Sequence, residues 1–209
     1  MHANHDSLTS EIALVLVGEK KFRIHKTHLR SSSDFFKNAT KAEWTDPDDP
    51  AKPIDLSDES PDTFEAYGHW LYSRKILAKE ELGATWNHLA HLYVLGEKLM
   101  DKTFQDAVID TMIGFNGSKR TTPASDAIII IYKGTPGGSP ARRLMVDFYA
   151  YMATSNWSGL HLKNISEFRG TEFLEELVPM LIEQREVPPL RVMRPWRALP
   201  ESYRFDGGR

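Results

Sequence analysis

The stretch KFRIHKTHLRSSSDFF, residues 21–36, changes its hydrophobic period part-way along. Phe22 and Ile24 alternate with polar residues, which is typical of a half-buried strand. Leu29 and then Phe35–Phe36 follow at spacings that suit a helix instead. The sequence therefore predicts a short strand that leads through a turn into the start of a helix.

The segments next to this stretch predict a hairpin and a helix cap. Residues 11–18 (EIALVLVG) are rich in aliphatic and β-branched residues and predict a strand with both faces largely covered. Gly18 marks a turn into the second strand, so the two strands should form a hairpin. A serine of Ser31–Ser33 can cap a helix that begins near Asp34.

An acidic, proline-bearing loop comes before the next helix. Residues 43–62 carry a single basic residue among many Asp and Glu, and their prolines disfavour a helix. Within this loop, Pro53–Leu56 alternates like a brief strand. Ser60 as cap and Pro61 in the first turn then predict a helix. The apolar face of that helix comprises Phe64, Tyr67, Trp70 and Leu71.

The second half of the chain has mainly helical periodicity. Residues 80–115 predict two helices that are broken near Asp101. The polar segment 116–125 is the best candidate for a domain boundary. The isoleucine-rich segment 127–132 is compatible with a strand or with a buried helix, and its helical surroundings favour the helix.

Two more helices are expected before a proline- and arginine-rich tail at residues 187–209, for which no regular element is predicted. Residues 141–154 and 172–184 both repeat apolar residues at helical intervals, and Pro179 can kink the second helix. The predicted apolar residues are Leu144, Phe148 and Tyr151 in the first helix, and Phe173, Leu174, Leu177, Val178 and Leu181 in the second.

Length, charge and composition limit the classes of function. A chain of 209 residues with 41% hydrophobic residues accommodates one or two domains. The net charge of -3 gives no basic surplus, so direct binding of nucleic acid is not expected. The absence of cysteine excludes thiol catalysis and fits a reducing compartment. No secretory signal or membrane-length apolar stretch is recognisable, so we expect an intracellular protein of the cytoplasm or nucleus, without membrane contact.

The order of these patterns resembles the BTB/POZ domain over residues 10–115. The matching pieces are Ile12–Gly18, Phe22–Lys26, Leu29, Ser33–Phe36, Ile54–Leu56, Pro61–Phe64 and Trp70–Tyr72. The resemblance implies an α+β fold, with a small, mostly three-stranded sheet covered by helices, that acts as a non-enzymatic protein–protein interaction module without a cofactor. A helical extension at 126–186 and the tail at 187–209 would complete a chain that resembles short BTB proteins of fungi.

The resemblance also implies residues that bind a partner. BTB domains that recruit a cullin scaffold to ubiquitin ligases often carry a bulky apolar residue, any residue and a glutamate after the paired-aromatic helix. Trp44-Thr45-Asp46 stands at about that place, with an aspartate one methylene shorter than the glutamate. Tyr72 matches a family tyrosine near the same surface. Trp44, Asp46 and Tyr72 are therefore the candidate partner-binding residues, and a cullin is the candidate partner.

A second implied feature is a charge pair for dimerisation or for the core. Glu11 and Lys26 stand where dimer-forming members pair an acid of the first core strand with a base near the second. A buried pair of this kind favours one docking geometry more than it adds stability. The residues before the first strand are too few for the long N-terminal arm that such dimers exchange. A homodimer would therefore need another surface.

Other functions have less support from the residues. His25 has no nucleophile in a fixed nearby pattern, and His88 with His91 is too small a ligand set for a metal. The glycines of residues 134–143 lack the Gly-Lys-Ser/Thr ending of a phosphate-binding loop, so a turn before a capped helix is favoured.

Two alternatives to an adaptor stay open at this point. One is a transcription-associated BTB scaffold that acts through a partner, since no DNA-binding signature follows the domain. The other is a small hydrolase or transferase in the C-terminal half that uses His161 with Glu167, which rests only on the presence of these groups.

Overall fold

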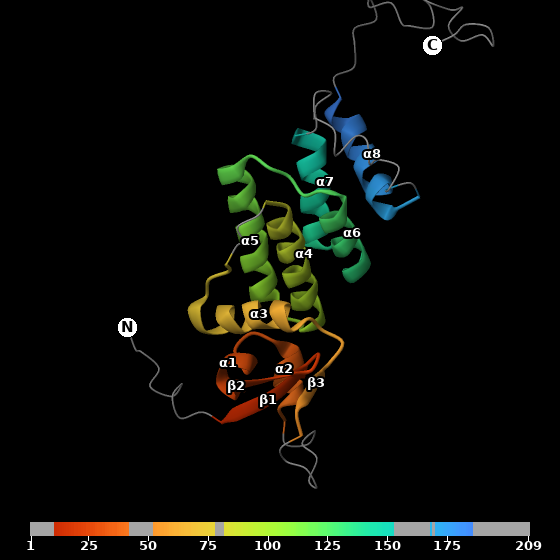
Figure 1. Ribbon diagram of the computed structural model, residues 1–209. Coiled ribbons are helices and arrows are strands. Elements are labelled where there is room, and N and C mark those ends of the chain that lie inside the picture. The colour runs from red at the N-terminus through yellow and green to blue at the C-terminus, as the bar shows by residue number, and fades with distance from the viewer. Residues whose placement is uncertain (1–10, 42–51, 78–81, 153–167, 169, 186–209) are drawn as a thin grey trace, which may run out of the picture.

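The structure, a computed structural model, describes residues 11–41, 52–77, 82–152, 168 and 170–185. Within these ranges the chain forms three strands and eight helices. The sheet lies at one end of an elongated molecule, and the later helices extend away from it (Figure 1). The predicted α+β class, with a small three-stranded sheet followed by helices, is confirmed.

The sheet is built on the predicted hairpin. β1 (Ile12–Val17) pairs antiparallel with β2 (Lys20–His25) and parallel with β3 (Ile54–Leu56), so the strand order is β2-β1-β3. Gly18 turns the hairpin with φ at 54°, a left-handed value that favours glycine. The buried side chains of β1 are Ala13, Val15 and Val17. The opposite face is only partly buried, so the prediction of two covered faces holds for one face alone.

Two short helices follow β2. α1 (Lys26–Arg30) begins directly after the strand, and α2 (Asp34–Ala39) starts at the predicted cap. The Ser33 hydroxyl oxygen accepts the Phe36 N–H at 3.1 Å and donates its proton to the Leu99 carbonyl at 2.6 Å. One serine therefore caps α2 and also ties it to the helical part of the chain. The predicted turn contains a complete helix, α1, that the sequence reading did not separate.

α3 (Pro61–Ser73) crosses above the sheet in Figure 1 and separates it from the later helices. It begins as predicted, with the Ser60 side chain accepting the Thr63 N–H and a proline in the first turn. The predicted apolar face is confirmed, because Phe64, Tyr67, Trp70 and Leu71 are all buried. Aromatic rings from α3, α2 and the helix that follows Asp101 meet there and form the core of this region.

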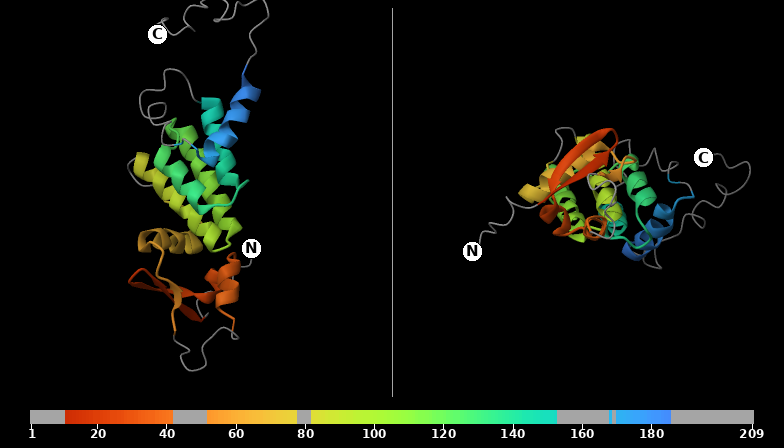
Figure 2. Two further views of the ribbon diagram at one scale, coloured as in Figure 1. Left: turned by 90° about the vertical axis from the view of Figure 1, so that its right-hand side faces the viewer. Right: turned by 90° about the horizontal axis from the view of Figure 1, so that it is seen from below.

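α4 (Leu82–Lys98) and α5 (Lys102–Lys119) lie side by side in both views (Figures 1 and 2). The predicted break at Asp101 is confirmed, and the Asp101 carboxylate caps α5 by accepting the Phe104 N–H at 3.0 Å. α5 continues to Lys119, so the first residues of the predicted linker 116–125 are helical instead.

The C-terminal part consists of α6 (Ser125–Gly134), α7 (Pro140–Met152) and α8 (Glu172–Gln184). α6 confirms the helical reading of residues 127–132. It approaches α4 so closely that a Cβ atom on Gly134 would lie 2.4 Å from Val94 Cγ1. These helices thus continue the helical core, with α8 at the end remote from the sheet (Figure 2).

Two predicted apolar faces are only partly right. Tyr151 on α7 is 65% exposed, and Val178 and Leu181 on α8 are also exposed. The buried side of α7 includes Arg142 and Tyr149. The spacing argument failed because it counted only apolar residues, whereas a charged side chain can be buried when hydrogen bonds satisfy it.

Candidate interaction site

β2 forms one edge of the sheet, and part of its backbone is free on the outer side. The Lys26 N–H donates to the Glu11 carbonyl at 2.7 Å and extends the β1–β2 ladder by one residue pair. Hydrogen-bonded and non-hydrogen-bonded pairs alternate in an antiparallel ladder. The N–H and C=O groups of Lys21, Arg23 and His25 therefore point away from β1.

Tyr72 connects the last turn of α3 to this edge. Its hydroxyl oxygen accepts the His25 N–H at 3.2 Å and lies 2.8 Å from His25 Nδ1. The centroid of its ring is 4.3 Å from that of His28 on α1. Half of the residue nevertheless remains exposed. Tyr72 is thus an aromatic side chain that is fixed at the surface and occupies one free backbone group of the β2 edge.

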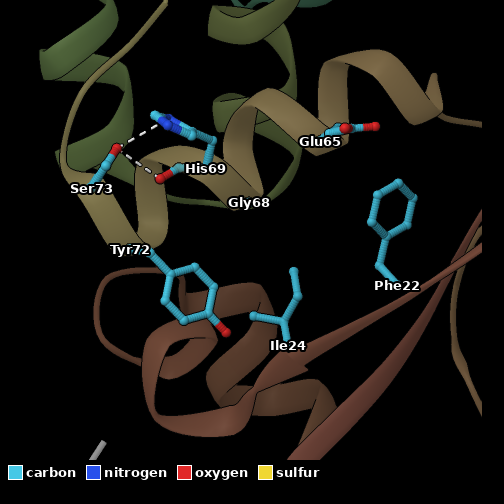
Figure 3. Close-up of a pocket in the computed structure, with 7 residues that line it drawn as sticks. All are labelled: Phe22, Ile24, Glu65, Gly68, His69, Tyr72 and Ser73. Carbon is cyan, nitrogen blue, oxygen red and sulfur yellow. Dashed lines mark hydrogen bonds between the residues drawn. The ribbon is translucent and has the colours of Figure 1, made fainter.

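A groove of about 470 Å³ lies between β2 and α3 (Figure 3). Its lining residues are Phe22, Ile24, Glu65, Gly68, His69, Tyr72 and Ser73. We call it the β2–α3 groove. Gly68 keeps it open, since a Cβ atom there would meet only Ile24 Cδ1, at 3.6 Å. The groove therefore has an apolar floor and a helix wall without a side chain at its middle.

The strand beside the groove is basic. Lys20 forms an ion pair with Glu65 at 2.7 Å, and both side chains are more than half exposed, so this pair adds little to stability. Lys21 and Arg23 are exposed and have no ion pair among the described residues. Two positive charges next to the groove are therefore not neutralised within the described chain.

Comparison with known families agrees with this architecture. The BTB/POZ domain profile matches residues 4–109, about half of the chain. The chain belongs to the BTB/POZ family. BTB domains are typically non-enzymatic modules that mediate interactions between proteins, and this BTB protein is an interaction module in that general sense. A search of curated proteins found no match.

Protonation of His28 is unfavourable, because its ring is partly buried and lies near His25 and Arg74. Burial lowers the pKa of His28, and the positive charges of His25 and Arg74 lower it further. The neutral imidazole is therefore favoured where its ring packs against Tyr72.

The predicted charge pair forms within the chain. Lys26 Nζ donates to a carboxylate oxygen of Glu11 at 2.7 Å, and the Glu11 side chain is 80% exposed. The hydrogen bond from Lys26 lowers the pKa of Glu11. The pair therefore lies at the surface and not in the core, because it closes the open end of the hairpin. A role in a dimer stays a prediction.

The other candidate residues fall outside the described part of the chain. Trp44 and Asp46 lie in segment 42–51, and His161 and Glu167 lie in segment 153–167. Of the three candidate partner-binding residues, Tyr72 is therefore the one that the structure places.

The described ranges contain neither a metal-binding cluster nor a membrane-spanning helix. No cluster of three or more His, Cys, Asp or Glu side chains there could hold a metal ion. In the same ranges, no helix combines the length and apolar character that crossing a membrane requires.

Asp101 is one of two charged side chains whose burial the sequence analysis did not predict. It is fully buried, and its carboxylate accepts hydrogen bonds from Ser32 Oγ at 2.6 Å and Tyr67 Oη at 2.9 Å, besides the Phe104 N–H. Burial and the charge of Asp101 raise the pKa of Tyr67, so its hydroxyl stays a donor. This centre joins the loop before α2 to α3 and α5.

Arg142 is the second buried charge. Its guanidinium donates to the carbonyls of Tyr132 at 2.8 Å and Thr135 at 2.5 Å, and pairs with Glu172 of α8. The Ser139 hydroxyl accepts the Arg142 N–H at 3.3 Å, which agrees with a capped helix after the glycine-rich turn. Arg142 thus ties α6, α7 and α8 together and is not available for a phosphate.

Proposed function

We propose that this BTB protein is an adaptor that links a bound protein to a cullin-based ubiquitin ligase. The observation that supports the proposal is the position of Tyr72. It corresponds to a family tyrosine near the cullin surface, and it is half exposed while its hydroxyl is held by His25. The Trp44-Thr45-Asp46 sequence after α2 supplies the matching acidic and aromatic side chains.

The geometry of Tyr72 suits a binding hot spot. An aromatic ring fixed before binding loses little conformational entropy when a partner covers it, and tyrosine combines apolar contact area with a polar end. The tyrosine is held from two sides, by the edge of β2 and by the ring of His28. A partner that packs on this ring would therefore meet a preformed surface.

The proposal is tested by retention of the full chain on an immobilised cullin N-terminal domain. We expect the wild type to be retained and Trp44→Ala to be lost, because the bulky apolar side chain is the core of the recognition sequence. Asp46→Glu should strengthen binding by restoring the longer carboxylate, whereas the matched Asp48→Glu should leave it unchanged. Failure of the folded wild type to bind would exclude the adaptor role.

A further inference from the structure

The β2–α3 groove offers recognition groups that the described chain does not use. We propose that it binds an acidic, extended peptide segment of a partner protein, which adds as a strand to the free edge of β2. This inference goes beyond the cullin proposal, because it concerns the cargo that the module carries, and the groove shares Tyr72 with the proposed cullin surface.

The backbone of β2 provides the first argument. The outward N–H and C=O groups of Lys21 and Arg23 have no partner among the described residues, since β1 occupies only the other side of the strand. An edge strand with free groups is a template for another strand. At His25 the Tyr72 hydroxyl takes the free N–H, so the added strand would end beside Tyr72.

The side chains of β2 provide the second argument. Phe22 and Ile24 point into the β2–α3 groove, as Figure 3 shows, and their spacing of two matches the repeat of a strand. The Phe22 ring is held edge-to-face against Phe64, with centroids 5.0 Å apart. Ile24 itself is buried, and because Gly68 has no side chain, the groove is left with room beside the α3 backbone for an apolar side chain of a bound peptide.

Charge identifies the chemistry of the peptide. Lys21 and Arg23 alternate with Phe22 and Ile24, so they lie on the opposite face of β2. A strand paired with β2 would place alternate residues in the groove and the intervening ones beside Lys21 and Arg23. Opposite charges on neighbouring strands are favourable. The expected peptide therefore alternates apolar and acidic residues.

The same charges argue against a second copy of this chain at the edge. Two β2 strands paired with each other would bring Lys and Arg side chains of both copies together. Like charges directly opposite one another destabilise a sheet. An acidic segment from another protein is therefore the favoured occupant.

The probe for the test is a display library of short random peptides selected on the intact protein. We expect enrichment of peptides with alternating acidic and apolar residues. Gly68→Leu fills the groove from a helix position and should weaken the selected peptide about tenfold or more, about 1.4 kcal/mol. The double change Lys21→Glu and Arg23→Glu should weaken it similarly, and Lys119→Glu with Lys133→Glu is the matched control that should not.

Backbone pairing is tested with N-methylated versions of the selected peptide. Methylation should abolish binding at alternate residues, whose N–H groups pair with β2, and be tolerated at the residues between them. Thermal unfolding of each variant shows that it is folded. Trp44→Ala should leave peptide binding intact, and the double change Lys21→Glu and Arg23→Glu, on the face of β2 away from the groove, should leave cullin binding intact, so the two proposals fail separately.

Three results would overturn the inference. These are no enrichment of acidic alternating peptides, equal binding of the selected peptide by Gly68→Leu and wild type, and tolerance of N-methylation at every position. If light scattering shows instead a dimer that Gly68→Leu dissociates, the edge binds a second copy and the proposed occupant is wrong.

Discussion

Asp101 and Arg142 are both buried charges that join three segments of the chain, but they are satisfied in different ways. The Asp101 carboxylate is surrounded by hydroxyl and backbone donors that are uncharged. Arg142 is surrounded by backbone carbonyls and by the carboxylate of Glu172, whose side chain is 64% exposed. The Asp101 carboxylate is thus shielded from water, whereas the ion pair of Arg142 is exposed to water on the side of Glu172.

The two buried charges lie in different halves of the molecule, Asp101 in the BTB half and Arg142 in the C-terminal helices. If Asp101 is replaced, the groups that donate hydrogen bonds to its carboxylate lose their acceptor inside the core between the sheet and the helices. Loss of Arg142 would leave the buried Thr135 carbonyl without this donor, but its carboxylate partner Glu172 could turn to water instead. Because a stranded buried group costs more than a solvated one, the BTB half should depend on its charge centre more strongly than the C-terminal half does.

Of the two buried charges, Asp101 should have the larger effect when it is lost. Asp101→Ala removes the cap of α5 and leaves the Tyr67 hydroxyl without its acceptor, so we expect the free energy of unfolding to fall by about 3–4 kcal/mol. Urea denaturation measures this change. Asp101→Asn, which keeps an acceptor oxygen, should cost clearly less, and equal losses for both variants would show that the hydrogen bonds are unimportant.

Removal of Arg142 should have a smaller and more local effect. Arg142→Met keeps the apolar stem, and we expect a loss of about 2 kcal/mol, mostly from charge-assisted hydrogen bonds. Hydrogen exchange should quicken in α6, α7 and α8 while β1 stays protected. If exchange quickens equally in the sheet, the two halves are not independent and the comparison between them fails.

Trp86 lies between the two halves, and its replacement by phenylalanine should have an effect near zero. Its ring contacts Phe115 of α5 and Phe148 of α7, yet its buried N–H has no hydrogen-bond partner among the described residues. Trp86→Phe loses volume and also removes this unsatisfied donor, so we expect a change below about 1 kcal/mol. Trp86→Ala, by contrast, should cost about 3–5 kcal/mol. Thermal unfolding of both variants checks the difference.

Mild acid should affect the BTB half through His28, and this is the smallest expected effect. Burial lowers the pKa of His28 in the folded state below its ordinary value of 6.5. The unfolded chain therefore binds the proton first, so stability falls as pH drops through that value and levels off below the folded-state pKa. Thermal unfolding should show a weaker pH dependence for His28→Gln than for the wild type. Identical pH profiles would mean that His28 does not titrate as described.

Local signals explain why much of the BTB fold could be predicted. Gly18 marks the hairpin, Ser60 with Pro61 starts α3, and Asp101 breaks the helical run, because each acts on residues close to it in sequence. The role of Asp101 could not be predicted in this way. Its partners Ser32 and Tyr67 lie 69 and 34 residues away, so no local spacing in the sequence predicts these contacts.

The candidate site was predictable only in part, for the same reason. Tyr72 was found through its place in the family pattern, but its bond to His25 spans 47 residues. Gly68 looks in the sequence like a residue that merely weakens a helix. Its effect on the β2–α3 groove becomes visible only when β2 is placed beside it.

Titration calorimetry of a cullin N-terminal domain into the intact chain tests most directly the claim that this BTB protein is an adaptor. We expect saturable binding that Trp44→Ala abolishes and that Lys21→Glu with Arg23→Glu preserves. The absence of binding by wild-type protein that unfolds cooperatively on heating would contradict it.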